Sequence, residues 1–344
     1  METSEMILPK LSEIKKSIPR RCFSPKTRVS FGYLLRNILM IVALYLLAIS
    51  FPEDMPLLFK GVFWAVYILL QGTLFFGLFL LGHDYGHGAF SKNRKINNVA
   101  GIFVHSILLL PFTPWKLTHR NHHRFCGHFN KDEGYGPVES GSKVNRKVSA
   151  LMAIFGVAYW CYMFGISRHG TNHYSLNDPL FKSMRKQTAI SLAVVLCVFI
   201  ALIFAIINYG FVDVFLLYIA PLQVYTYYFM VVTFLQHNNE ELIWYNDKEW
   251  GFLKGSLTTI DRDYKFLNGF LYNTGLHQIH HLIPSIPHYH LIEATHHFRK
   301  SFPDLVHISH ENPILAYFKN LTRYARDGEV PEGDSQFSYA KKNI

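Results

Sequence analysis

Four long runs of apolar residues constrain the fold of this chain more than any other feature of the sequence. They cover approximately Tyr33–Phe51, Val62–Gly82, Thr188–Ile207 and Val214–Leu235. A helix needs about 20 such residues to cross the hydrocarbon core of a bilayer, so each run is long enough for one crossing. Only 17% of all residues are charged, which is low for a soluble protein. The sequence predicts an all-α integral membrane protein with four transmembrane helices.

The segments that connect these runs predict how the helices pair and which way they cross. The first connection holds Glu53 and Asp54, and the second, Asn208–Asp213, contains no Lys or Arg. Both are short, so the helices form two hairpins. The N-terminus, residues 83–187 and the chain after residue 236 are rich in Lys and Arg. Because such segments stay in the cytosol, we expect a cytosolic helical cap, lumenal short loops and cytosolic N- and C-termini.

A fifth apolar run, Ser149–Ile166, also passes a crude test of hydropathy. Lys143 and Lys147 precede this run and Arg168 follows it, and basic residues on both sides disfavour a crossing of the membrane. We therefore expect an interfacial or buried helix at this place, and a similar helix at Val99–Leu110.

The N-terminal segment is basic, and Ile7, Leu11, Ile14 and Ile18 recur in it at helical spacing. This pattern is typical of a helix that lies on a membrane surface; the alternative is a loosely ordered tail. The four cysteines of the chain stand at irregular spacings without a CxxC pair. Neither a disulfide framework nor a thiolate metal site is therefore indicated.

We expect three regions along the chain. Residues 1–32 form a basic cytosolic N-terminal segment, and residues 33–311 form the membrane domain. Residues 312–344 form a cytosolic C-terminal tail, which ends in Lys341-Lys342-Asn343-Ile344. Two lysines at this distance from the end resemble a retrieval signal for the endoplasmic reticulum, although a solvated basic tail has the same composition.

Histidine is concentrated in three short clusters that begin at His83, His119 and His277, and His237 follows directly on the fourth apolar run. Residues three and four apart share one face of a helix, so an HxxxH or HxxHH cluster presents its imidazoles side by side. Histidines that cap helices or line a polar surface are the ordinary alternative, but it suits single residues better than a repeated pattern. The predicted metal ligands are His83, His87, His119, His122, His123, His237, His277, His280 and His281.

Nine imidazoles are too many for one metal ion and suit two. Imidazole binds Zn, Cu, Fe and Ni, and a zinc site takes only three or four protein ligands, whereas iron is the natural pair for oxygen chemistry. His83 and His237 adjoin predicted spans, so we expect the metals just beyond the bilayer edge, where a lipid tail can enter a buried tunnel. Each ligating ring also needs an acceptor for its second N–H. The candidate acceptors are Asp84, Asn121, Asp132, Glu133, Asp261, Asp263 and Glu293.

Several further segments accompany the histidines. They are the N-terminal Leu11–Phe23 segment, Gly88-Ala-Phe-Ser91, Asp132-Glu133 with Pro137, Leu257–Tyr264, and Pro287-His-Tyr-His290 with Glu293-Ala-Thr295. With the three histidine clusters, they resemble the membrane fatty-acid desaturases, and more closely the plant-type acyl-lipid oleate and ω-3 (linoleate) desaturases. The segments 127–133, 244–250 and 279–287 look more like the ω-3 branch. Tyr85 and Gln278 depart from the usual residues of that branch.

The resemblance implies oxygen-dependent desaturation of a fatty acyl chain in membrane lipid, of the ω-3 (linoleate to α-linolenate) or Δ12 (oleate to linoleate) type. It implies two Fe as cofactor, O2 as co-substrate, and no catalytic residue beyond the nine ligands. Two electrons would arrive from NADH through cytochrome b5 reductase and cytochrome b5, an external donor, in the endoplasmic reticulum membrane. The implied partners are therefore membrane lipid acyl chains and cytochrome b5, and no nucleic acid.

Two other readings of the same residues lead to different functions. A lipid hydroxylase or acetylenase would use the same histidine clusters, because the outcome depends on small differences in substrate placement. A histidine-rich metal transporter or receptor is a non-enzymatic alternative. Transporters place polar ligands inside their spans, whereas the four apolar runs here are nearly free of histidine and acidic residues.

Overall fold

The computed structural model describes residues 8–52, 54–134 and 136–340. Ile7 of the expected N-terminal stripe and the two lysines near the C-terminus lie outside these ranges. The helices are α1 (Leu11–Ser17), α2 (Thr27–Ile49), α3 (Leu57–His87), α4 (Arg94–Ser106), α5 (Phe112–Phe125), α6 (Arg146–Ile154), α7 (Val157–Met163), α8 (Arg185–Tyr209), α9 (Phe211–Val214), α10 (Ala220–His237), α11 (Phe252–Ser256), α12 (His277–Leu282), α13 (Leu291–Ser301) and α14 (Pro313–Asp327).

Three pairs of very short strands fasten loops of the cap to one another. β1 (Val138–Glu139) pairs in parallel with β5 (Glu329–Val330), and β3 (Asp261–Arg262) pairs in parallel with β4 (Ile308–Ser309). The antiparallel pair is formed by β2 (Trp244–Tyr245) and β6 (Gln336–Phe337). Each strand has two residues, so these pairs tie segments together without forming a layer, and the fold is all-α as predicted.

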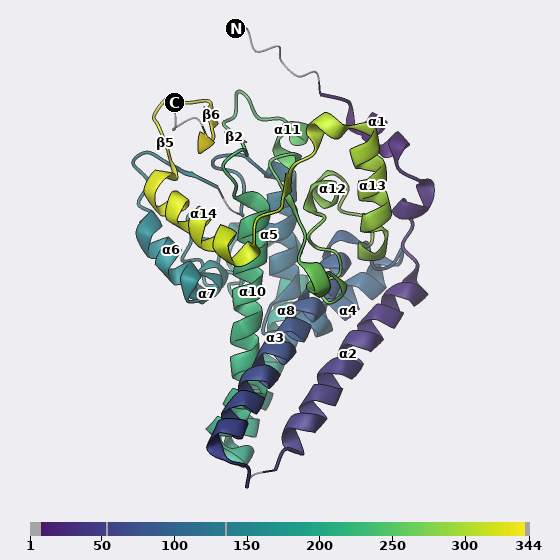
Figure 1. The fold of residues 1–344 in the computed structure, drawn as a ribbon, viewed down its shortest axis with the longest axis vertical. Coiled ribbons are helices and arrows are strands. Elements are labelled where there is room, and N and C mark those ends of the chain that lie inside the picture. The colour runs from purple at the N-terminus through teal and green to yellow at the C-terminus, as the bar shows by residue number, and fades with distance from the viewer. Residues whose placement is uncertain (1–7, 53, 135, 341–344) are drawn as a thin grey trace.

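The four predicted crossings are confirmed as helices long and apolar enough to span a membrane. They run over Thr27–Ile49, Leu57–His87, Pro179–Tyr209 and Phe211–His237. The last is continuous through α9, one π-helical segment and α10. Figure 1 shows these helices as an elongated bundle below, with the rest of the chain gathered into a cap above it. Two helices exceed the predicted runs, since α2 begins six residues before Tyr33 and α3 continues through His87.

The four spans are not equivalent in burial. The most apolar part of α3 is 72% buried inside the protein, whereas that of α8 is 11% buried. α3 packs closely along α10, and a Cβ on Gly72 would lie only 2.5 Å from the side chain of Val224. α2 and α8 thus leave most of their apolar surface to the bilayer, while α3 and α10 form the central pair.

The N-terminal segment does not lie on a membrane surface, and it is not a loose tail in its described part. Ile14 and Ile18 are buried in an apolar cluster with residues of α12 and α13, among them Ile279, Leu291 and Phe298. The expectation was wrong because helical spacing of apolar residues shows only that a face is covered. Here the cap covers that face, and the residues of α1 and α13 lie side by side (Figure 1).

Neither of the two additional apolar runs crosses the membrane, as predicted. Ser149–Ile166 is divided at Gly156, whose φ of +70° ends α6 and separates it from α7. The resulting helices have 9 and 7 residues, far fewer than the about 20 that a crossing needs. The C-terminal region is folded against the cap. α14 packs on α6, where the hydroxyl of Tyr317 donates to the carbonyl of Ala153 at 2.9 Å.

Candidate metal centre

Four helices deliver the nine predicted histidines to one place inside the cap. His83 and His87 form the last turn of α3, which ends at Gly88 in the left-handed conformation (φ +72°). α5 carries the second cluster, α12 carries the third, and His237 is the last residue of α10. Because i and i+4 positions share a face, each helix turns its histidines toward the others.

The first group, called the five-histidine cluster, combines residues from α3, α5 and α12. Its members are His83, His87, His119, His123 and His280. Their Nε2 atoms form a chain of short contacts: His83 to His87 is 3.2 Å, and His87 to His119 is 3.0 Å. The chain continues from His119 to His123 at 3.1 Å and from His123 to His280 at 3.2 Å.

The second group, called the four-histidine cluster, consists of His122, His237, His277 and His281. Nε2 of His237 lies 3.2 Å from Nε2 of His122 and 3.0 Å from Nε2 of His277. The ring of His281 lies beside all three, with ring centroids 4.5 to 5.0 Å apart. It also stacks on His123 of the first cluster at 4.1 Å, so the two clusters adjoin.

The arrangement of these nitrogens fits two metal ions. Ligand nitrogens bind such ions at about 2.0 to 2.1 Å, so two nitrogens at right angles around one ion lie about 3 Å apart. The Nε2 separations of 3.0 to 3.2 Å match this value in both clusters. Both ring nitrogens of His281 are buried without a hydrogen-bond partner among the described residues, and metal coordination would satisfy one of them.

The electrostatic surroundings keep these rings in the form that binds metal. Burial lowers the pKa of His119, His123 and His280 well below the ordinary value of 6.5, and the neighbouring histidines lower it further. The same two causes lower the pKa of His277 and His281. These rings are therefore neutral at pH 7, and a neutral imidazole has a lone pair available for a metal ion.

Asp132 holds one of the rings in place. His122 donates from Nδ1 to the Asp132 carboxylate at 2.5 Å, which leaves Nε2 directed toward His237. Asp132 is buried, and it also accepts from the backbone N–H groups of Gly127 and Gly134. Burial alone would raise the pKa of Asp132, but His122 and the Gly134 N–H outweigh it and lower that pKa. The carboxylate thus stays ionised beside the four-histidine cluster.

The other candidate acceptors divide into those near the clusters and those elsewhere. Asp84 lies 3.9 Å from Nδ1 of His83 and accepts a hydrogen bond from Nδ1 of His288 at 2.8 Å. Asp261 accepts from the backbone N–H groups of His277 and Gln278, at the start of α12. The other four candidates bind other groups: Asn121 donates to Glu133, Asp263 binds Lys265 and Asn268, and Glu293 pairs with Arg21.

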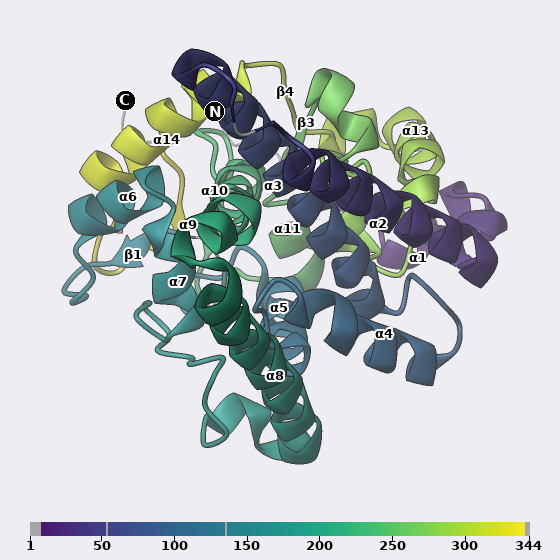
Figure 2. The same ribbon diagram turned by 90° about the horizontal axis from the view of Figure 1, so that it is seen from below.

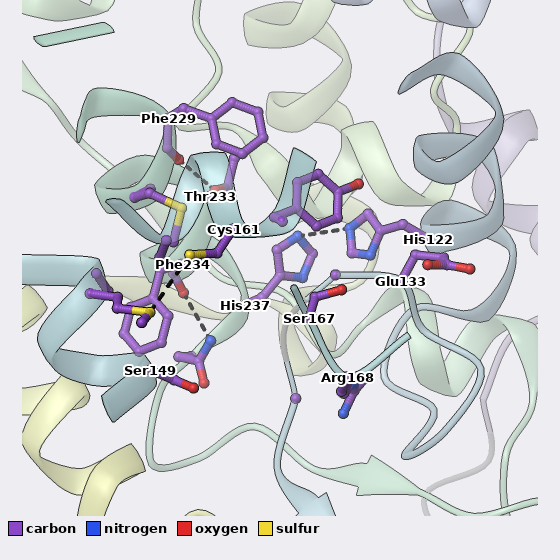
Figure 3. A pocket seen from close by; sticks show the side chains of 18 of the residues that line it. His122, Glu133, Ser149, Cys161, Ser167, Arg168, Phe229, Thr233, Phe234 and His237 are labelled. Atoms are coloured by element: carbon purple, nitrogen blue, oxygen red, sulfur yellow. Dashed lines mark hydrogen bonds between the residues drawn. The ribbon is translucent and has the colours of Figure 1, made fainter. Parts of the chain in front are cut away.

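An apolar cavity of about 690 Å³ adjoins both clusters. Its wall includes His83 and His119 of the five-histidine cluster and His122, His237 and His277 of the four-histidine cluster. Figure 3 shows His122 and His237 joined beside the cavity, with Phe229, Thr233 and Phe234 of α10 along one side. The remaining wall comes from apolar residues of α3, α6, α7 and α14, from Trp115 of α5, and from the loops at residues 133–134, 136–145 and 166–169, which add polar side chains. The apolar part of the wall suits a hydrocarbon chain next to the metal centre.

Comparison with known proteins identifies the family that shares this arrangement. A model of the fatty acid desaturase family matches residues 62–312. The chain belongs to the fatty acid desaturase family. It is 35% identical, over 298 residues, to an omega-3 fatty acid desaturase of the endoplasmic reticulum from Vigna radiata var. radiata, an alignment that covers 83% of this chain and 76% of the relative.

Two further relatives come from a cyanobacterium and a plant. The sn-1 acyl-lipid omega-3 desaturase (ferredoxin) of Synechocystis sp. is 35% identical over 317 residues, which is 90% of this chain and 86% of the relative. The chloroplastic sn-2 acyl-lipid omega-3 desaturase (ferredoxin) of Helianthus annuus is 36% identical over 296 residues, 83% of this chain and 65% of that longer protein. This desaturase is therefore a membrane-embedded oxidoreductase of fatty acyl chains. The alternative of a histidine-rich metal transporter or receptor is rejected.

Sequence reasoning about the desaturase missed two residues beside the clusters. The Cys126 thiol lies 3.8 Å from Nδ1 of His237 and is close to His122 and His281, although no thiolate site was expected. Its position four residues after His122 was the available signal. Arg168 donates to the carbonyl groups of Asp132 and Pro137 and to His169. It fixes the loop that carries Asp132, and no sequence pattern pairs these distant segments.

Proposed function

We propose that this desaturase is an ω-3 acyl-lipid desaturase that converts linoleoyl chains of membrane lipid to α-linolenoyl chains. The observation that carries the proposal is the pair of imidazole clusters in the wall of an apolar cavity. The five-histidine cluster would hold one iron and the four-histidine cluster the other, and bound iron would supply the activation of O2. In balance, one –CH2–CH2– unit, O2, two electrons and two protons yield one –CH=CH– unit and two water molecules.

The residues of the chain itself bind the substrate and exclude water. Phe79, Leu80 and Trp115 are buried beside His83 and His119, and all of them line the cavity. They can enclose an acyl chain in a fixed conformation next to the ligands, which raises the effective concentration of two adjacent methylenes. A dry apolar wall also protects a reactive centre from side reactions with solvent.

The shape of the cavity supports a reaction near the methyl end of the chain. Lys143 and Asn145 in its wall are exposed, whereas Phe76 and Phe79 are buried, so its closed end lies among the residues of α3. Phe79 precedes His83 by four residues, about 6 Å along α3, so a chain end that reaches Phe79 lies close to the metal centre. The names of the three relatives described above, each an omega-3 desaturase, support the same regiospecificity.

The proposed electron donor is cytochrome b5, and the proposed location is the endoplasmic reticulum membrane with both termini in the cytosol. The relative from Vigna radiata is named for that compartment, whereas the relatives from Synechocystis and Helianthus are named for ferredoxin. Purified desaturase supplied with NADH, cytochrome b5 reductase and cytochrome b5 should turn over. Turnover with reduced ferredoxin alone would assign the protein to the other electron chain.

The fatty-acid profile of a host that makes oleate but no polyunsaturated chains tests the reaction. We expect new α-linolenate in cells that express the chain and are fed linoleate, and none without feeding. Linoleate formed from endogenous oleate would show the Δ12 reaction instead, and a hydroxylated product would show the hydroxylase alternative. His280→Ala, which removes one predicted ligand, should give no product, whereas His310→Ala at an exposed position outside both clusters is the matched control.

A further inference from the structure

Three short helices form one side wall of the cavity, and none of them is long enough to cross a membrane. Ala150 and Ala153 of α6, Ala158 of α7, and Leu321 and Tyr324 of α14 face the cavity. α6 and α14 lie side by side (Figure 2), joined by the hydrogen bond from Tyr317 to the carbonyl of Ala153. The wall defined by α6, α7 and α14 therefore separates the cavity from the outside of the molecule.

The outer surface of this wall carries exposed apolar residues around α6 and the start of α14. Leu151 on α6 and Phe155, which directly follows α6, are 56% and 66% exposed, and Ile314 and Leu315 on α14 are 66% and 71% exposed. On α6 and directly after it, the exposed apolar positions 148, 151 and 155 recur at helical spacing. α6 thus has two apolar faces, one toward the cavity and one outward, which is unusual for a helix in contact with water. On α14 the outward apolar residues Ile314, Leu315 and Phe318 lie in the first two turns, and the exposed Lys319 and Arg326 follow them.

The apolar face of this wall lies close to the four spans. α6 and α7 lie beside α10 at the level where the four spans leave the cap (Figure 1). Their exposed apolar residues, together with the exposed Phe103 of α4, extend the apolar surface that the four spans present to the bilayer. The start of α6 carries the exposed Lys143 and Lys147, and basic residues beside an apolar face are typical of a helix at the boundary between head groups and acyl chains.

The mouth of the cavity lies at the same place. Ser142, Lys143, Asn145 and Val148, which line the cavity, are exposed at the start of α6. A lipid that remains in the bilayer by its second acyl chain can reach an opening at this level without leaving the membrane. A substrate on a soluble carrier would gain nothing from an entrance beside this apolar surface.

We propose that the wall of α6, α7 and α14 is immersed in the cap-side leaflet, and that the acyl chain of a glycerolipid enters the cavity laterally at residues 142–148. The lateral entry of an acyl chain rests on the proposed desaturation, whereas the immersion of the wall does not. Lys143 and Lys147 then lie at the level of the head groups, while one acyl chain passes between α6 and the loop at Arg168 toward the histidine clusters.

The depth of the wall is measured first, with the full chain in lipid nanodiscs. A cysteine is introduced as Leu151→Cys or Leu315→Cys in a Cys197→Ser background, which lacks the exposed native thiol. A fluorophore attached to the new cysteine reports whether its surroundings are lipid or water. We expect quenching by nitroxide on lipid acyl chains and protection from aqueous iodide. The control is Ile292→Cys, which is 61% exposed on α13 on another side of the cap (Figure 1). Quenching of the wall positions by iodide alone overturns the immersion, whether or not the protein is active.

The entry route is measured with two substrates, linoleoyl phospholipid in the nanodisc and soluble linoleoyl-CoA. We expect turnover of the phospholipid without CoA, and about a tenfold fall in that turnover for Leu151→Asp and Leu315→Asp, because each loses apolar contact with the leaflet. Ile292→Asp should retain wild-type turnover, and all three variants should retain their iron. Faster turnover of linoleoyl-CoA overturns lateral entry. Lipid quenching without desaturation of either substrate would reject the proposed function and leave the immersion in place.

Discussion

His122 illustrates, at the scale of single residues, how a buried carboxylate prepares a ring for metal binding. The Nδ1–H donates to Asp132, so Nε2 is the nitrogen left to face the four-histidine cluster. Arg168 in turn holds the backbone of Asp132 at 2.8 Å. A metal ligand commonly depends on such an outer partner nearly as much as on its own ring.

Replacement of Asp132 by Asn should therefore weaken metal binding at the four-histidine cluster. An amide neither carries the charge nor accepts from Nδ1 as strongly, and we expect a loss of about 10- to 100-fold in affinity for one of two irons. Iron content per chain after dialysis against a graded chelator measures this loss. Asp263→Asn, at an exposed carboxylate bound to Lys265, is the matched control. Equal iron retention in both variants would contradict the role of Asp132.

The buried histidines also predict how the stability of iron-free protein depends on pH. Burial and neighbouring rings lower the pKa of His119, His123 and His280 below the 6.5 of an unfolded chain. Below pH 6.5 the unfolded state binds more protons than the folded state, so the free energy of unfolding falls as pH falls, by up to about 1.4 kcal/mol per pH unit for each ring. Thermal midpoints of the iron-free protein between pH 7.5 and 5.5 should decrease, and a constant midpoint would contradict the lowered pKa values.

At the scale of helices, close packing of α3 against α4 depends on a missing side chain. A Cβ on Gly82 would lie 2.1 Å from Nε2 of His105, which is buried against Trp115 and Phe79. Because His105 is fully buried among these rings, a methyl group at position 82 requires the ring, or α4 with it, to move. The site is one residue before the first histidine cluster, so a shift of the helices is transmitted to His83.

Gly82→Ala should therefore lower the thermal midpoint of the purified protein and its activity, because overpacking costs about 1–3 kcal/mol. The same helix offers a matched control. Gly61 has nothing within 4 Å of its hypothetical Cβ, and Gly61→Ala should leave the midpoint unchanged or raise it, by about 0.5–1 kcal/mol of helix propensity. Equal midpoints for the two variants in detergent solution would contradict the close approach of α3 and α4.

At the scale of the whole molecule, the cap and the four spans predict one orientation in the membrane. The nine histidines belong to α5, α12 and the last turns of α3 and α10, which lie on the cap side of the bundle (Figure 1), so the long segments between spans must share one side of the bilayer. An Asn-x-Ser acceptor placed in a lengthened loop between α2 and α3 should be glycosylated in the endoplasmic reticulum. An acceptor inserted near Asn177, between α7 and α8, should remain unmodified, and its modification would contradict a cytosolic cap.

The sequence by itself determined the features that depend on local patterns. Hydropathy over about 20 residues located the four spans, and basic flanks correctly removed Ser149–Ile166 from that count. Spacing of three and four residues identified eight histidines, and the place of His237 at the end of the fourth apolar run identified the ninth; the structure brings all nine together. The same local pattern misplaced the N-terminal helix, because the periodicity of Ile14 and Ile18 does not distinguish a membrane from a protein surface.

Only the tertiary structure decided which histidines form each cluster and which distant segments contact them. It divides the histidines into groups of five and four, so that His122 and His123, adjacent in the chain, face different clusters. It brings Arg168 to the loop of Asp132 and Cys126 to His237, across 36 and 111 positions of the chain. Such contacts follow from the packing of distant helices on one another, and neither hydropathy nor helical periodicity carries information about which faces meet.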